Sequence, residues 1–141
     1  MEANTIQKLQ NNNKPSRFLE DDMQMSVAFY LDSIGVLWFH PANERKSSIQ
    51  AGVRLKKKGV KSGVPDVMVL EPKKGFNGLA IELKTERSNG FKKNGQPKAT
   101  TKGKISESQE HWLKSLKDKG WITGVCYSVD EAIKQIDFYL K

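Results

Sequence analysis

The sequence is poor in cysteine and has no long apolar run. Its single cysteine, Cys126, excludes an internal disulfide and a zinc site built from cysteines. No apolar stretch approaches the roughly 20 residues that a membrane-spanning helix requires. The N-terminal stretch MEANTIQKLQNNNKPS lacks the basic-then-apolar pattern of a secretory signal. These absences lead us to expect an intracellular protein without a membrane segment.

Acidic residues are missing from two stretches of the sequence. RLKKKGVK and RSNGFKKNGQPKATTKGK together hold eleven basic residues, and the whole chain has a net charge of +8. Clustered Lys and Arg neutralise phosphates and release counterions, which favours a nucleic-acid partner over a merely soluble basic protein. The candidate DNA-binding residues are Arg54, Lys56, Lys57, Lys58, Lys61, Arg87, Lys92, Lys93, Lys98, Lys102 and Lys104.

The length of 141 residues suits one domain. We expect a flexible leader over 1–14 and a single domain over 15–141, with a long basic loop at 86–104. Periodicity predicts helices near 15–34, 47–58, 106–119 and 128–140, and strands near 36–40, 66–70, 79–85 and 121–128. The short link between the two middle strands favours an antiparallel hairpin. This order predicts an α/β fold with a mixed central sheet flanked by helices.

Charged residues interrupt the two middle strands. Asp66 precedes VMVL, and Glu82 and Lys84 lie within LAIELKTE. Side chains alternate along a strand, so Glu82 and Lys84 share a face, and the hairpin would bring Asp66 to the same end. Two carboxylates, a backbone carbonyl and water suit Mg²⁺ or Mn²⁺. We therefore predict a metal site at which Lys84 orients or deprotonates an attacking water. The alternative is a half-exposed strand with ion pairs across the hairpin.

Two helical residues are candidates for the same site. Gln109 precedes Trp112 and Leu116 by three and seven residues, so its amide faces the core and needs polar partners. It also completes a capping box with Ser106, which is sufficient reason for a glutamine there. Glu20 lies in the first turn of its helix, where it either reaches the metal through water or complements the helix dipole.

These residues resemble the virus-type replication-repair nuclease (VRR-NUC) domain, a branch of the PD-(D/E)xK phosphodiesterases. GVPD, IELK and SESQ are similar to its two strand motifs and its glutamine helix, and EDDMQ to its first-helix motif. The resemblance runs from about Leu19 to Leu140. It implies a restriction-endonuclease-like core, metal-dependent DNA cleavage by Asp66, Glu82 and Lys84, and the Leu83 carbonyl as a further metal ligand.

Stand-alone members of this kind occur in phages and bacteria, so the resemblance implies the cytoplasm of a bacterial cell or of a phage-infected host. It also implies a homodimer that cleaves branched DNA such as four-way junctions. The chain departs from the family pattern between ELKTE and SESQ, where its link is longer and more basic than usual. This departure leaves the substrate preference open.

The remaining polar and aromatic residues fit structural roles better. His40 and His111 lack partners at metal-ligand spacing. The three tryptophans suit core packing, and Phe91 is the aromatic residue that we expect to stack on an unpaired base. A catalytically inactive nucleic-acid-binding module with the same fold is the main alternative function, and a scaffold without a nucleic-acid role is a weaker one.

Overall fold

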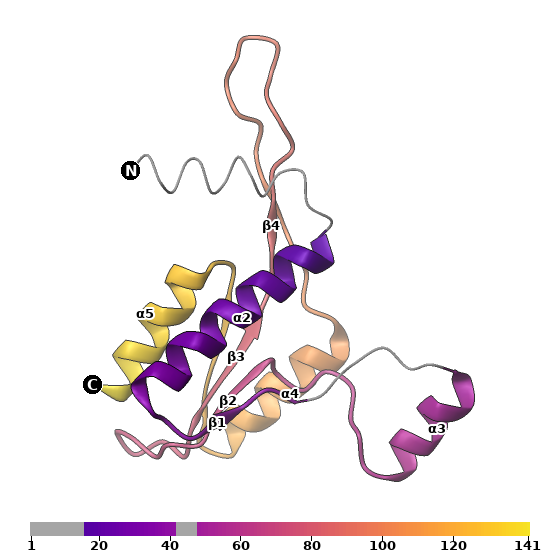
Figure 1. The fold of residues 1–141 in the computed structure, drawn as a ribbon, viewed down its shortest axis with the longest axis vertical. Coiled ribbons are helices and arrows are strands. Elements are labelled where there is room, and N and C mark those ends of the chain that lie inside the picture. Colours follow the sequence, from indigo (N-terminus) through magenta and orange to yellow (C-terminus); the bar gives the residue numbers. More distant parts are fainter. Residues whose placement is uncertain (1–15, 42–47) are drawn as a thin grey trace. The chain divides into compact units, whose positions relative to one another are not determined.

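The computed structural model describes residues 16–41 and 48–141 (Figure 1). The leader predicted over 1–14 lies outside the described residues. The described helices are α2 (Ser16–Ile34), α3 (Ile49–Lys57), α4 (Glu107–Asp118) and α5 (Val129–Leu140). The strands are β1 (Trp38–Phe39), β2 (Val67–Val69), β3 (Leu79–Leu83), β4 (Glu86–Arg87), β5 (Thr101–Lys102) and β6 (Ile122–Cys126). The predicted mixed α/β fold is confirmed.

The chain divides into two compact units. Of the described residues, one unit comprises those up to Val36 together with Leu83–Lys104 and Val125–Lys141, and the other comprises those within Leu37–Glu82 and Ile105–Gly124. We call them the helical unit and the sheet unit. The expectation of a single domain over 15–141 stays a prediction.

The main sheet has the strand order β1-β2-β3-β6. β2 is antiparallel to both β1 and β3, which confirms the predicted hairpin. Ile122 N donates to Gly78 O at 3.0 Å, and Lys84 N donates to Cys126 O at 2.9 Å. From the first bond to the second, the residue numbers increase along both strands. β6 therefore runs parallel to β3, and the sheet is mixed.

One face of the β2–β3 hairpin packs against α4 within the sheet unit. Met68 and Ala80 are paired across the strands and form a buried cluster with Leu116 of α4, against which Trp112 and Trp121 pack. This contact confirms the predicted core role of both tryptophans. Residues that share a face of a strand recur at every second position. The helix therefore covers the face that also carries residues 66 and 82.

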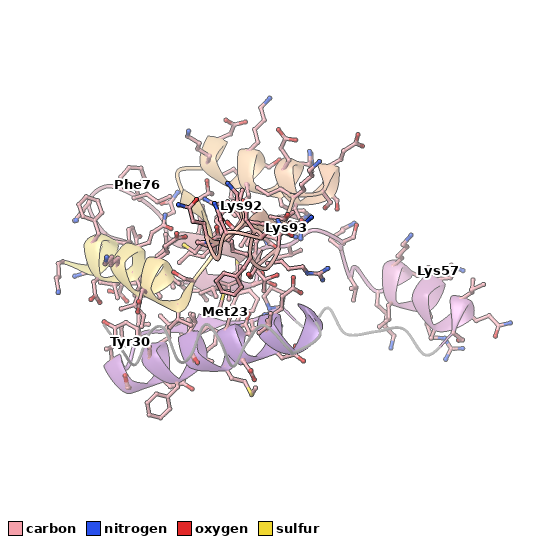
Figure 2. The ribbon with its side chains drawn as sticks, turned by 90° about the horizontal axis from the view of Figure 1, so that it is seen from above. Met23, Tyr30, Lys57, Phe76, Lys92 and Lys93 are labelled. Carbon is pink, nitrogen blue, oxygen red and sulfur yellow. The ribbon has the colours of Figure 1, made fainter. Side chains whose placement is uncertain are left out.

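In the helical unit α2 lies beside α5. Buried positions on α2 recur every four residues at Met23, Val27 and Leu31, as the apolar stripe predicts. The hydroxyl of Tyr30 (labelled in Figure 2) donates a hydrogen bond to the Asp137 carboxylate of α5, and this bond raises the pKa of the tyrosine. Ile34 lies three residues after Leu31 but does not belong to the buried stripe. Ile34 is 43% exposed because it lies in the last turn, beyond the buried positions.

One local prediction needs correction. Residues 86–104 are not a loop without strands, because β4 and β5 pair antiparallel within them. The N-terminus of α5 has only half of a capping box. Ser128 Oγ accepts from Glu131 N at 3.1 Å, but the Glu131 carboxylate accepts from Tyr127 N at 2.7 Å instead of from the cap. None of the helices in the described ranges is both long and apolar enough to cross a membrane.

The thiol of Cys126 is protected by the fold. Cys126 is buried and donates to the Gln135 side-chain oxygen at 3.1 Å. Burial, with a smaller contribution from the Glu131 carboxylate, raises the pKa of the thiol to about 11. The thiolate is the reactive form of cysteine, so the native thiol will be inert at neutral pH.

We expect alkylation of Cys126 by iodoacetamide at pH 8 to be at least about 100-fold slower in the native protein than in guanidinium chloride. Mass spectrometry measures the rate at one site, because the chain has a single cysteine. Equal rates in the two conditions would contradict the buried placement.

Candidate active site

Asp66 and Glu82 lie at the same end of the β2–β3 hairpin. The register pairs Val67 with Ile81, and one further step places Asp66 opposite Glu82. Opposed residues of an antiparallel pair point to the same face, with Cβ atoms about 4.5–5.5 Å apart. The hairpin therefore brings together the two acids that the sequence analysis selected.

Glu82 is the buried charged residue of this site. Its side chain is 3% exposed, and it is the sole polar or charged residue of the described chain in the buried class. A buried carboxylate is unfavourable unless hydrogen bonds or a cation compensate for lost hydration. Gln109 Nε2 of α4 supplies one such bond, donated to Glu82 Oε1 at 2.7 Å.

The capping box of α4 orients the Gln109 amide. Ser106 N donates to Gln109 Oε1 at 2.9 Å, and Gln109 N donates to Ser106 Oγ at 3.2 Å. With its oxygen committed to the cap, the amide turns its nitrogen toward Glu82. The two roles considered for Gln109 are thus combined in one side chain, since the helix cap fixes the donor.

Gly63 allows the loop before β2 to approach the start of α4 closely. A Cβ atom on Gly63 would lie 2.4 Å from Ser108 C and 2.7 Å from Gln109 N. Its φ of +84° is also one that glycine adopts far more readily than other residues. The glycine of GVPD therefore lets that motif pack against SESQ. Sequence reasoning did not assign this role, because a steric contact between distant segments has no local signal.

His40 contacts the backbone of Asp66. Its Nδ1 lies 2.7 Å from the Asp66 carbonyl oxygen. A carbonyl only accepts, so Nδ1 carries the proton in this bond. The residue follows β1, which is paired beside β2, and it supports the loop that carries Asp66. Sequence analysis assigned His40 a structural or surface role without locating this contact.

Lys84 belongs to the helical unit. Its backbone N donates to Cys126 O at 2.9 Å, which continues the hydrogen bonding of β3 by one residue. Its side chain is half-buried. Leu83, whose carbonyl is a predicted metal ligand, is 5% exposed. Glu20 is exposed on α2, and its participation in the site stays a prediction.

The donor set is compatible with a hard divalent cation. Asp66 and Glu82 offer oxygen ligands only, as Mg²⁺ and Mn²⁺ prefer. In the described ranges, no group of three or more His, Cys, Asp or Glu could hold a metal. Mg²⁺ needs no such group, because it is commonly bound by one or two carboxylates together with water and substrate phosphate.

The predicted phosphate-binding side chains are accessible. Within the sheet unit, Arg54, Lys56 and Lys57 of α3 are exposed, as are Lys58 and Lys61 after it (Lys57 in Figure 2). In the helical unit the basic residues of 86–104 are exposed, and two of them, Lys92 and Lys93, are labelled in Figure 2. His111 is exposed on α4, as expected of a surface residue.

The chain combines a mixed sheet, two acids at one end of its central hairpin and a helix glutamine that hydrogen-bonds one of them. The VRR-NUC domain model matches residues 13–130, and the chain belongs to this family. Membership implies nuclease-type processing of DNA. A solved structure described as a VRR_NUC domain protein shares the fold, with a TM-score of 0.63 at 20% identity over 86% of this chain and 87% of the other. No curated protein matches the chain.

Gly63→Ala tests the close approach. We expect it to destabilise the protein by about 2–4 kcal/mol, through backbone strain and the collision with α4. Gly59→Ala is the matched control, because Gly59 has φ +103° and nothing within 4 Å of an added Cβ. That variant should lose only about 1–2 kcal/mol. Urea unfolding measures both, and equal losses would show that the contact is unimportant.

Proposed function

We propose that this protein is a divalent-metal-dependent DNA endonuclease that hydrolyses phosphodiester bonds, with a preference for branched DNA such as four-way junctions. The observation that carries the proposal is the buried Glu82 carboxylate, opposite Asp66 and hydrogen-bonded by Gln109. A merely structural hairpin gains nothing from a buried acid, whereas a metal site requires one. Family membership supports the same conclusion.

Asp66, Glu82 and the Leu83 carbonyl are the proposed ligands of Mg²⁺ or Mn²⁺, with Glu20 assisting through water. When bound, the ion supplies Lewis acidity, which lowers the pKa of a coordinated water and stabilises charge on the phosphate. Gln109 holds one oxygen of Glu82, and so restricts the carboxylate to one orientation.

The lysine of the Glu-x-Lys motif provides the positive charge in this proposal. Lys84 follows Glu82 by two residues, and alternation along an extended chain directs both side chains to one face. Its ammonium group would orient the attacking water and offset the charge that develops on the phosphate. His40 holds the Asp66 backbone and is a positioning residue.

The basic side chains of the α3 region are proposed to bind DNA phosphates. Phosphate contacts position a protein on DNA without reading its sequence, so we expect recognition of DNA shape. A homodimer would suit a symmetric junction, because each subunit would cut one strand.

Isosteric substitutions test the proposed ligands. Asp66→Asn and Glu82→Gln keep the side-chain volume and remove the charge, and Lys84→Met removes the ammonium. We expect each to reduce cleavage by at least about 100-fold. The measurement uses end-labelled junction, flap, nicked and linear DNA with Mg²⁺, Mn²⁺ or EDTA. Metal-free DNA binding by fluorescence anisotropy checks that the variants remain folded.

Cleavage in EDTA would contradict the proposed metal dependence, and undiminished cleavage by these variants would contradict the proposed roles of the three residues. Metal-free binding of DNA by a wild-type protein that cuts no substrate on the panel would instead identify an inactive binding module.

Gln109→Ala tests the supporting role of the helix glutamine. We expect a fall of about 10- to 100-fold in activity at a fixed metal concentration, as is typical when a residue that orients a metal ligand is lost. Raising the Mn²⁺ concentration should recover part of the loss. Glu110→Ala, at the exposed neighbouring position on α4, is the control. If both variants lose activity equally, the Glu82 contact is not the cause.

A further inference from the structure

Residues 86–104 form an ordered β-hairpin, which we call the arm. Its base is the β4–β5 pair, and farther out Phe91 and Pro97 form a further antiparallel bridge. Lys98 N donates to Gly90 O at 2.9 Å, and Lys92 N donates to Gln96 O at 2.7 Å, which closes the turn. Figure 1 shows the arm as a long, narrow excursion of the chain that returns on itself.

The arm has a strongly basic, uncovered surface. It carries six Lys or Arg residues and one acid, Glu86, whose carboxylate accepts a hydrogen bond from the Thr100 hydroxyl. All of its side chains are exposed, and the ring of Phe91 is 60% exposed. A two-stranded hairpin without a core is only marginally stable in water. Such a surface suits a polyanionic partner that would also stabilise the hairpin.

The base of the arm rests on Lys84. Gly103 N donates to Thr85 O at 2.9 Å. A Cβ atom added to Gly103 would lie 3.4 Å from Lys84 Cδ and 3.5 Å from Lys84 Cβ, so the arm backbone passes over the aliphatic part of this lysine. Lys102 Nζ also lies 4.9 Å from the centre of the Tyr127 ring, which follows β6. Both contacts connect the arm to the residues around Lys84.

We propose that the arm binds a groove of duplex DNA in the substrate and, through its base on Lys84, selects which DNA reaches that lysine. A two-stranded ribbon fits the major groove of B-DNA, which is about 12 Å wide. Lysines on both sides of the turn would neutralise the flanking phosphates. The inference rests on the proposed function for the role of Lys84, whereas DNA binding by the arm is independent of cleavage.

Charge removal at the turn tests the DNA contact. The triple variant Lys92→Gln, Lys93→Gln, Lys98→Gln is compared with Lys114→Gln, Lys117→Gln, Lys119→Gln, which removes three exposed charges on α4 and its C-cap. Binding to labelled duplex is measured in EDTA over a series of salt concentrations. We expect the arm variant to bind at least about 10-fold more weakly, with a salt slope lower by up to about 2.7. The α4 variant should stay within about 2-fold of wild type.

Two results would overturn DNA binding by the arm. One is an arm variant with wild-type affinity and salt slope, and the other is an equal loss in the α4 variant. Because these measurements contain no metal, they give an answer even if the protein cuts nothing. In cleavage assays the loss in the arm variant should lie mainly in KM, as expected for residues that contribute to binding and not to the chemical step.

Gly103→Val tests the connection to Lys84. The added side chain would displace the lysine stem, so we expect kcat to fall at least about 10-fold while metal-free DNA binding stays within about 2-fold of wild type. Urea unfolding checks that the variant is folded, and Gly103→Ala should show a smaller loss of kcat. Wild-type kcat in a folded Gly103→Val variant would show that the base of the arm does not influence Lys84.

Discussion

The buried carboxylate of Glu82 constrains everything around it in the sheet unit. A charge at 3% exposure requires hydrogen-bond donors or a cation in place of water. The start of α4 must therefore lie where Gln109 reaches the carboxylate, and the Ser106 cap must hold the amide in the donating orientation. The loop before β2 must also pass close to the start of α4, which the glycine at position 63 permits. Glu82, Gln109, the Ser106 cap and Gly63 are thus all needed for one contact, the hydrogen bond between Gln109 and Glu82.

The chemistry and the binding of DNA make different demands on the chain. The carboxylates must be held rigidly, so they lie at the end of a buried hairpin whose register is set by apolar pairs such as Met68–Ala80. Phosphate binding requires long, exposed cations that adapt to a polyanion, and these lie on α3 and the arm. In our proposal Lys84 belongs to both systems, because it follows the buried strand and lies beneath the base of the arm.

The parts of the fold that depend on local rules were predictable. The spacing of Met23, Val27 and Leu31 predicted α2, and the short link before Leu79 predicted the antiparallel hairpin. The predictions failed at positions where local rules do not decide the structure. Ile34 continues the apolar spacing but lies exposed at the end of its helix, and residues 86–104 have loop composition but form a ribbon through backbone hydrogen bonds.

The sequence by itself determined which side chains were candidates for chemistry, because a charge within an apolar strand is visible without coordinates. It also determined the basic character of the chain and the order of its helices and of the strands in the main sheet. Only the tertiary structure decided that Asp66 stands opposite Glu82, that His40 contacts the Asp66 backbone, and that Gly63 meets the start of α4. The physical reason is that these contacts join residues distant in sequence, and their geometry depends on strand register and close packing rather than on local propensity.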